Sequence, residues 1–247
     1  MPMQTFRSSL VLIKPDALKN SLTGYILSQF SHFHAGLRFA ALKVVSVNQT
    51  LAEEHYAEHK GKFFYPSLLQ YIRGFIHFPD DPGKRRVIAI LYQGPNAIRN
   101  IRTICGPTNP HEARQKNPGC IRALGTVVPL NDENGKFIGN RTDNLIHASA
   151  NPEDAEREIK LWFIPTDIPP TMRSFPTEIN EDYYYYHKDC VINTIPRRGS
   201  FCFLSPGDIA WKSDLRVLRQ LKEGKKLDYS VNAAIAKYLI NRDVEKE

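Results

Sequence analysis

The sequence predicts a mixed α/β fold in which four strands alternate with helices. Apolar, partly β-branched runs of strand length recur along the first two thirds of the chain. Stretches with apolar residues at helical spacing separate these runs. The 247 residues are 42% hydrophobic, which suffices for one sizeable core or for one domain with a substantial appendage.

The first half of the chain supplies three of the expected strands and three of the helices. The strands are apolar runs at 9–13, 38–47 and 86–92, and Lys14-Pro15-Asp16 ends the first of them. The helices carry apolar residues at helical spacing over 22–35, 51–60 and 66–71. Gly36 is typical of a helix end, and the proline-rich segment 78–84 is typical of a loop.

The second half begins with a helix expected over 96–104. We expect 106–119, with three prolines, and the stretch around 131–135 to be loops. A fourth strand covers 144–149. A helix over 152–163 follows at once, because Asn151 is a good N-cap and Pro152 suits the first helical position. Pro165 ends that helix.

This order of elements leaves two topologies open. One is a doubly wound sheet, and the other is a four-stranded split βαβ sheet of the ferredoxin-like type, with helices on one face. Periodicity alone does not choose between them.

Charge and cysteine content restrict the class of protein. Lysine and arginine exceed aspartate and glutamate by 33 − 26 = 7, which favours anionic partners, although an ordinary basic soluble protein fits equally well. No C-x-x-C spacing occurs, which argues against zinc and against a disulfide framework. The four cysteines of the chain are Cys105, Cys120, Cys190 and Cys202.

No apolar run approaches the roughly 20 residues that span a bilayer. The N-terminal residues lack a signal-peptide profile, because their apolar stretch is short and contains Lys14. We therefore expect a reduced, soluble, cytoplasmic protein that does not enter a membrane. We do not expect nucleic acid as a partner, because the net charge is the only feature that suggests it.

The fourth strand carries His147 near its far end. Imidazole titrates near neutrality, and its neutral form is a good nucleophile. Taken alone, a single histidine in an apolar run is more often an ordinary core residue. Its interpretation therefore depends on the rest of the chain.

Several short motifs along the chain occur together in one protein family. They are Ile13-Lys14-Pro15-Asp16, Glu54-His55-Tyr56, Phe64 with Leu68, Gly94, Arg102 with Gly106-x-Thr108-Asn109-Pro110, Pro118-Gly119-x-Ile121-Arg122, Asn144-x-x-His147-x-Ser149 and Glu158-Ile159-x-Leu161-Trp162-Phe163. In this order, from about residue 5 to residue 165, the chain resembles the nucleoside diphosphate kinases.

The resemblance implies a ferredoxin-like fold and a specific activity. Enzymes of this family move the terminal phosphate of a nucleoside triphosphate to a nucleoside diphosphate, by a ping-pong mechanism through a phosphohistidine. Mg²⁺ acts on the nucleotide phosphates without direct protein ligands. Family members are homo-oligomers, usually hexamers or tetramers.

The resemblance also assigns roles to residues. His147 is the nucleophile, Glu158 orients its imidazole, and Lys14 reaches the ribose hydroxyls and the terminal phosphate. The other residues that match nucleotide-binding positions are Tyr56, Phe64, Leu68, Arg102, Thr108, Arg122 and Asn144. Arginine suits phosphate because its planar fork donates two parallel hydrogen bonds. An aromatic ring stacks on any base, so base specificity should be low.

The chain departs from the family pattern in three respects. Ala150 and Asn151 replace an acidic residue and a serine, which predicts reduced but not abolished activity. The loops at 78–84, 111–117 and 127–141 are longer than usual. Residues 166–247 follow the kinase-like domain 1–165 as an extension, packed on the core or at a subunit interface, with helices capped by Asp214 and Ser230. These departures leave a second function open, namely a nucleotide-binding or interaction module with little or no turnover.

Overall fold

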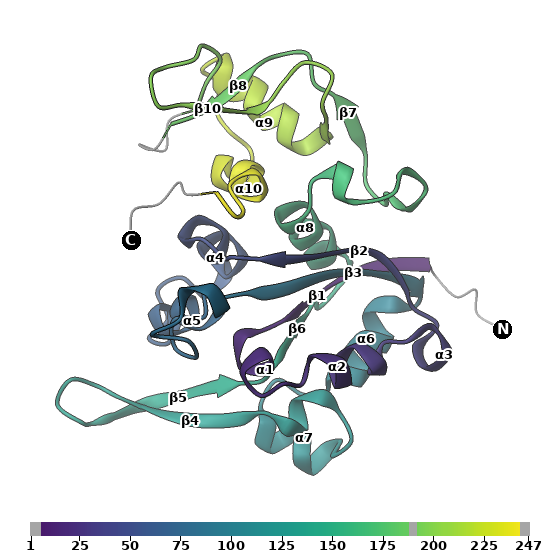
Figure 1. The fold of residues 1–247 in the computed structure, drawn as a ribbon, viewed down its shortest axis with the longest axis vertical. Coiled ribbons are helices and arrows are strands. Elements are labelled where there is room, and N and C mark those ends of the chain that lie inside the picture. Colours follow the sequence, from purple (N-terminus) through teal and green to yellow (C-terminus); the bar gives the residue numbers. More distant parts are fainter. Residues whose placement is uncertain (1–5, 188–191, 243–247) are drawn as a thin grey trace.

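The computed structural model describes residues 6–187 and 192–242. Cys190 and the outer ends of the two predicted domains lie outside these residues. The central sheet contains four strands in the order β2-β3-β1-β6, and every neighbouring pair is antiparallel (Figure 1). These strands are β1 (Phe6–Ile13), β2 (Arg38–Val45), β3 (Val87–Pro95) and β6 (Ile146–Ala148). The order confirms the ferredoxin-like topology.

Helices cover both faces of this sheet, so the expectation of helices on one face was wrong. The reason lies in β1, where Leu10, Val11, Leu12 and Ile13 are all fully buried and alternate side chains point to opposite faces. Leu10 and Leu12 pack in one hydrophobic cluster, and Val11 and Ile13 pack in another.

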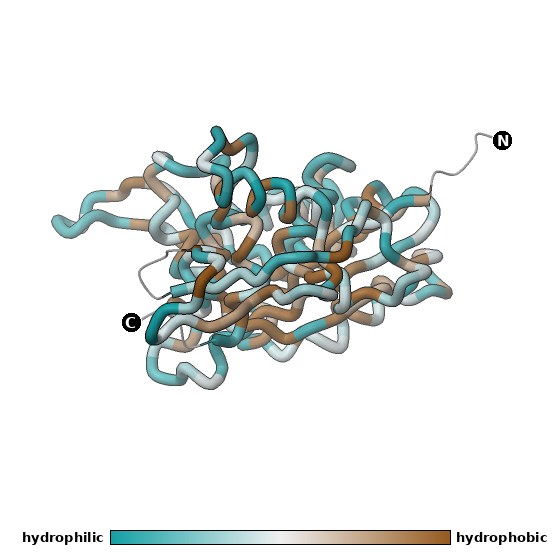
Figure 2. The backbone as a smooth tube through the Cα atoms, turned by 90° about the horizontal axis from the view of Figure 1, so that it is seen from above, coloured by the Kyte–Doolittle hydropathy of each residue, from teal (hydrophilic) through white to brown (hydrophobic). Residues whose placement is uncertain are grey.

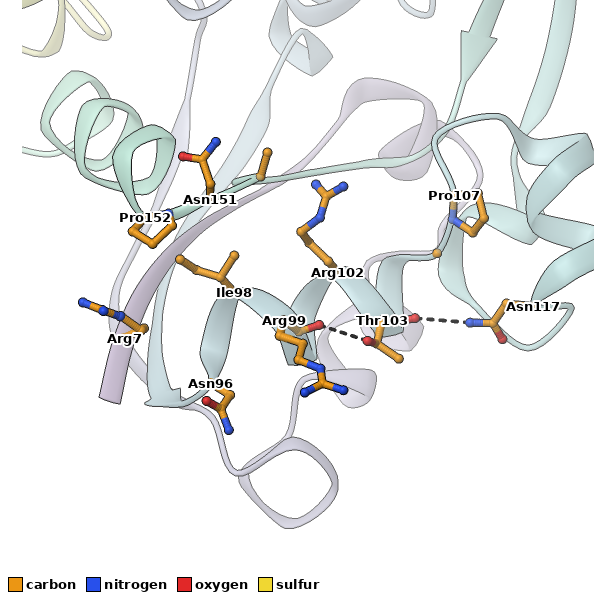
Figure 3. Close-up of a pocket in the computed structure, with 12 residues that line it drawn as sticks. Arg7, Asn96, Ile98, Arg99, Arg102, Thr103, Pro107, Asn117, Asn151 and Pro152 are labelled. Atoms are coloured by element: carbon orange, nitrogen blue, oxygen red, sulfur yellow. Dashed lines mark hydrogen bonds between the residues drawn. The ribbon is translucent and has the colours of Figure 1, made fainter. Parts of the chain in front are cut away.

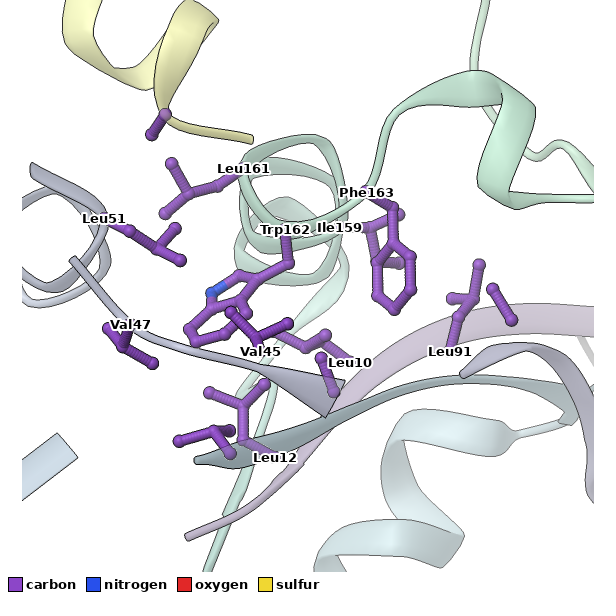
Figure 4. Close-up of a cluster of buried hydrophobic side chains, with 14 of the residues drawn as sticks. Leu10, Leu12, Val45, Val47, Leu51, Leu91, Ile159, Leu161, Trp162 and Phe163 are labelled. Atoms are coloured by element: carbon purple, nitrogen blue, oxygen red, sulfur yellow. The ribbon is translucent and has the colours of Figure 1, made fainter. Parts of the chain in front are cut away.

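The first cluster lies under α4 (Gln49–His55) and α8 (Pro152–Trp162). Trp162 from α8 and the next residue, Phe163, fill the space between that helix and the sheet (Figure 4). The second cluster involves α1 (Pro15–Lys19), α2 (Thr23–Gln29) and α6 (Ala97–Cys105). In Figure 2 the outer loops are mostly hydrophilic, as expected for segments outside the two clusters.

The helices of the first half differ from expectation in three places. The helix expected over 51–60 ends at His55, and a separate 3₁₀ turn follows over Ala57–His59. The helix expected over 22–35 is divided into α2 and α3 (His32–Ala35), because the Ser31 hydroxyl accepts a hydrogen bond from the His34 N–H and starts a new helix. Gly36, with φ of 66°, ends α3 as predicted. The short helix α1 was not predicted, although Pro15 at its first position is a start signal.

The second half contains structure in both segments that were expected to be loops. Residues 106–119 include α7 (Pro110–Lys116), which the Asn109 side chain caps by accepting from the His111 N–H. Around 131–135 the chain forms a hairpin of β4 (Thr126–Asn131) and β5 (Phe137–Asp143). Its turn is closed by the Asp132 carboxylate, which accepts from the N–H groups of Asn134 and Lys136.

The remaining elements of the predicted kinase-like domain are close to expectation. The helix α5 (Tyr65–Ile72) matches the one expected over 66–71, and Asn151 caps α8 by accepting from the Asp154 N–H. Short 3₁₀ turns complete the described chain: η1 (Ala57–His59), η2 (Pro82–Lys84), η3 (Ile121–Leu124), η4 (Pro165–Asp167), η5 (Pro170–Met172) and η6 (Ala236–Tyr238). Among the described residues, no helix combines the length and apolarity that crossing a bilayer requires.

The extension forms two small sheets and two helices that lie against the core beside α4 and α8 (Figure 1). Its elements are β7 (Thr177–Ile179), β8 (Tyr184–Tyr186), β9 (Ile192–Asn193), β10 (Phe201–Leu204), β11 (Ile209–Trp211), α9 (Lys212–Lys222) and α10 (Val231–Ile235). The fully buried Trp211 donates its indole N–H to the Phe163 carbonyl at 2.7 Å. The boundary between the two predicted domains stays a prediction.

One of the two predicted helix caps in the extension is correct. Ser230 caps α10, because its hydroxyl accepts from the Ala233 N–H at 3.2 Å. Asp214 is not a cap: it lies inside the first turn of α9, and its carboxylate accepts from the Lys237 ammonium group at 2.7 Å. The buried Lys237 ammonium group holds the carboxylate in this position through a charge-assisted hydrogen bond.

Candidate active site

A strained turn places His147 at the end of the sheet. Leu145 has a positive φ of 66°, which is rare for a residue with a side chain, and the Ile146 N–H donates to the Asn144 carbonyl at 2.7 Å. The Asp16 carboxylate accepts from the Leu145 N–H at 2.8 Å, and the Leu145 side chain is buried. These contacts hold a backbone conformation that costs of order 1–3 kcal/mol, as is common at functional sites.

Glu158 on α8 lies against the imidazole of His147. Nε2 of His147 is 2.9 Å from one carboxylate oxygen, an ion-pair distance, although the ring N–H is not aligned as a hydrogen bond. The other oxygen accepts from the Ser149 hydroxyl at 2.6 Å. Burial alone would raise the pKa of Glu158, but the charge of His147 and the Ser149 hydrogen bond help to lower it to about 2.

This arrangement leaves Nδ1 of His147 for a substrate. Nδ1 forms no hydrogen bond with another described residue, and about 20% of the His147 side chain is exposed. An imidazole with one nitrogen held by a carboxylate and the other open is the arrangement of an oriented nucleophile or base.

A second histidine, His55, packs edge-on against His147 with ring centroids 4.5 Å apart. Its Nδ1 accepts from the Trp162 indole N–H at 3.2 Å, and its buried Nε2 has no partner among the described residues. Burial, with the charge of His147, lowers the pKa of His55 well below its usual value. His55 is therefore neutral at pH 7.

His55, His147 and Glu158 offer ligand atoms within 4.8 Å of one another. Two imidazoles and a carboxylate suit zinc-like cations, whereas Mg²⁺ prefers oxygen ligands. Of the nearby carboxylates, Asp143 and Glu158 have both oxygens in contact with protein groups. Asp16 accepts from Leu145 with one oxygen, and its other oxygen is buried without a partner among the described residues. The described residues therefore fit a magnesium ion carried by nucleotide phosphates better than one bound directly by the protein.

Lys14 lies at the end of β1 and is 4% exposed. Its ammonium group donates to the Asn144 side-chain oxygen and lies 4.7 Å from the centre of the Tyr71 ring. The Asn144 amide in turn donates to the Thr108 carbonyl at 2.9 Å. Burial lowers the pKa of Lys14 to about 8, although Asp16 acts in the opposite direction. A cation is thus held next to the turn that carries His147.

The two candidate phosphate-binding arginines occupy different environments. Arg122 is buried and donates to the carbonyls of Gly106, at 2.9 Å, and Ile146, at 3.2 Å, which places its guanidinium beside the residue before His147. Arg102 on α6 is exposed and lines a cavity together with Ala150 (Figure 3). No contact of its side chain with the His147 group is recorded among the described residues.

The expected base-binding residues form a separate wall. Phe64 lies 5.6 Å from the His59 ring centre, and His59 stacks on Tyr56 at 6.0 Å. Tyr56 is buried and packs edge-on against His55, which connects this wall with the histidine pair. Leu68 packs partly against the core. No direct contact of Phe64 or Leu68 with His147 is recorded among the described residues.

Sequence reasoning assigned no role to Asp16 and His55. Both lie inside motifs that were recognised, Lys14-Pro15-Asp16 and Glu54-His55-Tyr56, so a signal was present. Their partners are Leu145 and Trp162, which are distant in the sequence. Contacts over such separations cannot be read from periodicity.

The fold and the site together define an α/β protein with an antiparallel sheet and a histidine–carboxylate pair close to cationic side chains. The sequence model of the nucleoside diphosphate kinase family matches residues 7–168. This match covers more than half of the chain. The chain therefore belongs to the nucleoside diphosphate kinase family.

Individual relatives agree with this assignment. A nucleoside diphosphate kinase of Thermus thermophilus is 37% identical over 160 residues, which are 65% of this chain and 97% of that protein. One from Treponema pallidum (strain Nichols) is 38% identical over 163 residues, or 66% of this chain and 91% of that protein. The family match ends at residue 168, so the extension lies almost wholly outside it.

Solved structures show the same fold. The nucleoside diphosphate kinase of Aquifex aeolicus aligns with a TM-score of 0.53 and 30% identity, covering 67% of this chain and all of that one. A transition-state mimic of the Borrelia burgdorferi enzyme, with bound vanadate and ADP, aligns with a TM-score of 0.51 and 28% identity, covering 68% of this chain and 94% of that one.

Proposed function

We propose that this protein is a nucleoside diphosphate kinase that transfers the terminal phosphate of a nucleoside triphosphate to a nucleoside diphosphate through a phosphohistidine at His147. The observation that carries the proposal is the contact of 2.9 Å between Nε2 of His147 and the Glu158 carboxylate, within a family-matched fold. This contact leaves Nδ1 as the nucleophile.

In the first half-reaction, the lone pair of Nδ1 attacks the γ-phosphorus. The bond to the oxygen that bridges the β- and γ-phosphates breaks, and the nucleoside diphosphate leaves. In the second half-reaction, a terminal oxygen of another nucleoside diphosphate attacks the phosphohistidine, and the nitrogen–phosphorus bond breaks. Glu158 stabilises the positive charge that develops on the imidazole while it carries the phosphate.

Cationic side chains neutralise the substrate. We assign Lys14, Arg102 and Arg122 to the phosphates, with Thr108 as a further contact, because phosphoryl transfer depends mainly on positioning and on charge neutralisation. We assign Asn144 to the sugar, Phe64 and Leu68 to the base, and Tyr56 to the lining of the phosphate site. Mg²⁺ bound by the phosphates would neutralise part of their charge.

We also propose that the protein is a homo-oligomer in which β2 contributes to a subunit contact. This strand is at the edge of the sheet, and Phe39, Leu42 and Val44 on it are half exposed. An exposed apolar edge strand readily pairs with another chain. The domain boundary near residue 165 and the cytoplasmic location stay predictions.

The proposal is tested by incubating the purified protein with ATP labelled at the γ-phosphate. We expect acid-labile label on the protein, its loss on addition of a nucleoside diphosphate, and no label in His147→Ala. A matched control is His34→Ala, because His34 is an exposed histidine on α3. Tight ADP binding without any labelled protein would contradict the proposal and indicate the nucleotide-binding module instead.

A further inference from the structure

We propose that the hairpin β4–β5 positions the wall that binds the nucleotide base, with Gly139 as the positioning residue. The hairpin includes the segment 127–141, the loop that is longer here than in the resembling family. It lies next to the start of α5, and Phe64, which we assigned to the base, directly precedes that helix (Figure 1). The inference rests on the proposed function, because it concerns how a base is held.

A close approach between Gly139 and Phe63 joins the hairpin to this wall. A Cβ atom on Gly139 would lie 2.4 Å from Cε2 and 2.5 Å from Cζ of the Phe63 ring, whereas carbon atoms that are not bonded stay about 3.5–4.0 Å apart. The ring edge thus occupies the space that a side chain would need. Glycine in a strand often marks such an approach or a bulge, and the ladder here also shifts register between Leu130, the partner of Gly139, and Asn131.

The Phe63 ring transmits this contact to Phe64. Their ring centroids are 5.4 Å apart at an interplanar angle of 89°, which is the edge-to-face geometry that aromatic pairs favour. Phe63 is 59% exposed, so its contact with Gly139 restricts a ring that the protein interior does not enclose. A wall that is fixed before the base arrives loses less freedom on binding, which raises the affinity for the nucleotide.

The root of the hairpin is fixed at the sugar side of the site. β5 ends at Asp143, whose carboxylate accepts from the Arg141 guanidinium at 2.6 Å and lies 2.9 Å from Nε2 of the buried His77. The next residue is Asn144, which we assigned to the sugar. Gly139 precedes Asn144 by five positions, so one continuous strand connects the base wall with the sugar contact.

Calorimetric titration of the full-length protein with ADP measures the effect of Gly139. We expect Gly139→Ala to raise the dissociation constant of ADP about fivefold, because the methyl group displaces the Phe63 ring and leaves the wall less ordered. The exposed ring can move aside without unfolding the protein.

Gly135→Ala, in the turn of the same hairpin, is the matched control. Gly135 also has a positive φ, of 79°, but beyond its chain neighbours no atom of a described residue lies within 4 Å of its Cβ position. This variant therefore adds backbone strain without the clash, and its affinity for ADP should equal that of the wild type.

Ribose 5-diphosphate separates the base wall from the rest of the site. It carries the sugar and the phosphates of ADP without the base, so Gly139→Ala should leave its dissociation constant unchanged. A general distortion of the fold would instead weaken the binding of both ligands by the same factor.

A double variant tests whether Gly139 acts through Phe63. Phe63→Ala alone should weaken ADP binding, and adding Gly139→Ala should weaken it no further, because the methyl group then has no ring to displace. The proposal is overturned by wild-type affinity for ADP in Gly139→Ala, by equal weakening of both ligands, or by additive effects in the double variant. These titrations need no phosphate transfer, so a wild type that takes up no label at His147 would contradict the proposed transfer and not this inference.

Discussion

Burial gives Lys14 a property that an exposed lysine lacks. Its pKa is lowered to about 8, so the ammonium group is charged below this pH and loses its proton as the pH rises through it. Because an uncharged amine attracts phosphate poorly, kcat/KM for the nucleotide should fall above about pH 8. The pH profile of kcat/KM reports the free enzyme and is the appropriate measurement.

Lys14→Arg provides the comparison for this profile. A guanidinium keeps its charge at every pH at which the protein is folded, so the variant should lack the decrease near pH 8, although its absolute rate will be lower. A wild-type profile that stays flat up to pH 10 would show that Lys14 is not the titrating group.

In the proposed mechanism, Glu158 orients the imidazole of His147 and stabilises the positive charge of the phosphorylated ring. Glu158→Gln keeps the size of the side chain but removes the carboxylate that lies 2.9 Å from His147. We expect kcat/KM to fall about a hundredfold, a typical value for loss of a group that assists proton or charge transfer. Steady-state kinetics measure this, with Ser149→Ala as a milder variant that loses the hydrogen bond to Glu158 and the one accepted from the Leu10 N–H. Equal rates in Glu158→Gln and the wild type would contradict the assigned role.

The same carboxylate makes the fold sensitive to acid. Because the pKa of Glu158 is about 2 in the folded chain and 4.5 without these interactions, its stabilisation is present above pH 4.5. It is lost as the pH falls from about 4.5 towards 2, since the folded state must then take up the proton against the charge of His147. Urea unfolding should show a shallower acid dependence in Glu158→Gln.

At the scale of elements, a buried ion pair joins α9 to η6 within the extension. The ammonium of Lys237 lies 2.7 Å from the Asp214 carboxylate, and their side chains are 0% and 1% exposed. Burial raises the pKa of Asp214 and lowers that of Lys237, while the attraction between them opposes both changes. Lys237→Met leaves a buried carboxylate without its partner, which should cost about 3–5 kcal/mol.

The double variant Lys237→Met with Asp214→Leu tests whether the loss of stability comes from the unpaired carboxylate. Because both charges are gone, it should recover much of the stability in urea unfolding. Lys222→Met is a suitable control, since Lys222 pairs with Asp182 on the surface and should change stability by less than about 1 kcal/mol. A single variant as stable as the wild type would show that the pair contributes little.

The extension also contacts the two helices, α4 and α8, that contribute residues to the candidate site. The Ser230 hydroxyl at the start of α10 donates to the Glu54 carboxylate at 2.7 Å, and Glu54 precedes His55 on α4. Trp211 lies in the same hydrophobic cluster as Trp162 and Phe163. The described part of the extension therefore supports α4 and α8, the two helices that carry His55 and Glu158.

Local signals explain which elements the sequence could predict. The helix α8 was predictable because Asn151 and Pro152 mark its start and an apolar stripe marks its buried face. The hairpin β4–β5 was missed because its turn, with Asp132 and Gly135, was interpreted as part of a longer loop. The break between α2 and α3 was missed because the apolar residues keep helical spacing across it. Ser31, which caps α3, was interpreted as an interior position of one long helix.

The candidate site was predictable to the extent that its residues lie in motifs. His147, Glu158, Lys14 and Asn144 were all named from the sequence, and the structure brings the first two together and the last two together. The strained turn at Leu145 left no local signal, because leucine is not a residue that favours positive φ. The environment of Arg102 likewise depends on how α6 lies against the chain at Ala150 and Asn151, which is distant in the sequence.

At the scale of the whole molecule, the proposed subunit contact concerns the open edge of the sheet at β2. The extension covers one end of this edge, since the Asn241 side chain accepts from the Ser46 N–H at 2.8 Å and donates to the Val44 carbonyl at 3.4 Å. The side chains of Phe39, Leu42 and Val44 stay 50–53% exposed. Any subunit contact through β2 must therefore use the part of the strand before Val44.

Leu42→Glu tests this contact. A charged side chain in the middle of an apolar edge opposes pairing with a second copy, because the carboxylate would lose its water without gaining a partner. We expect light scattering to show a smaller assembly for the variant than for the wild type, with unchanged folding by circular dichroism. Ile195→Glu is the matched control, since Ile195 is 73% exposed and lies in the extension. A monomeric wild type, or the same assembly in Leu42→Glu, would show that β2 does not join subunits.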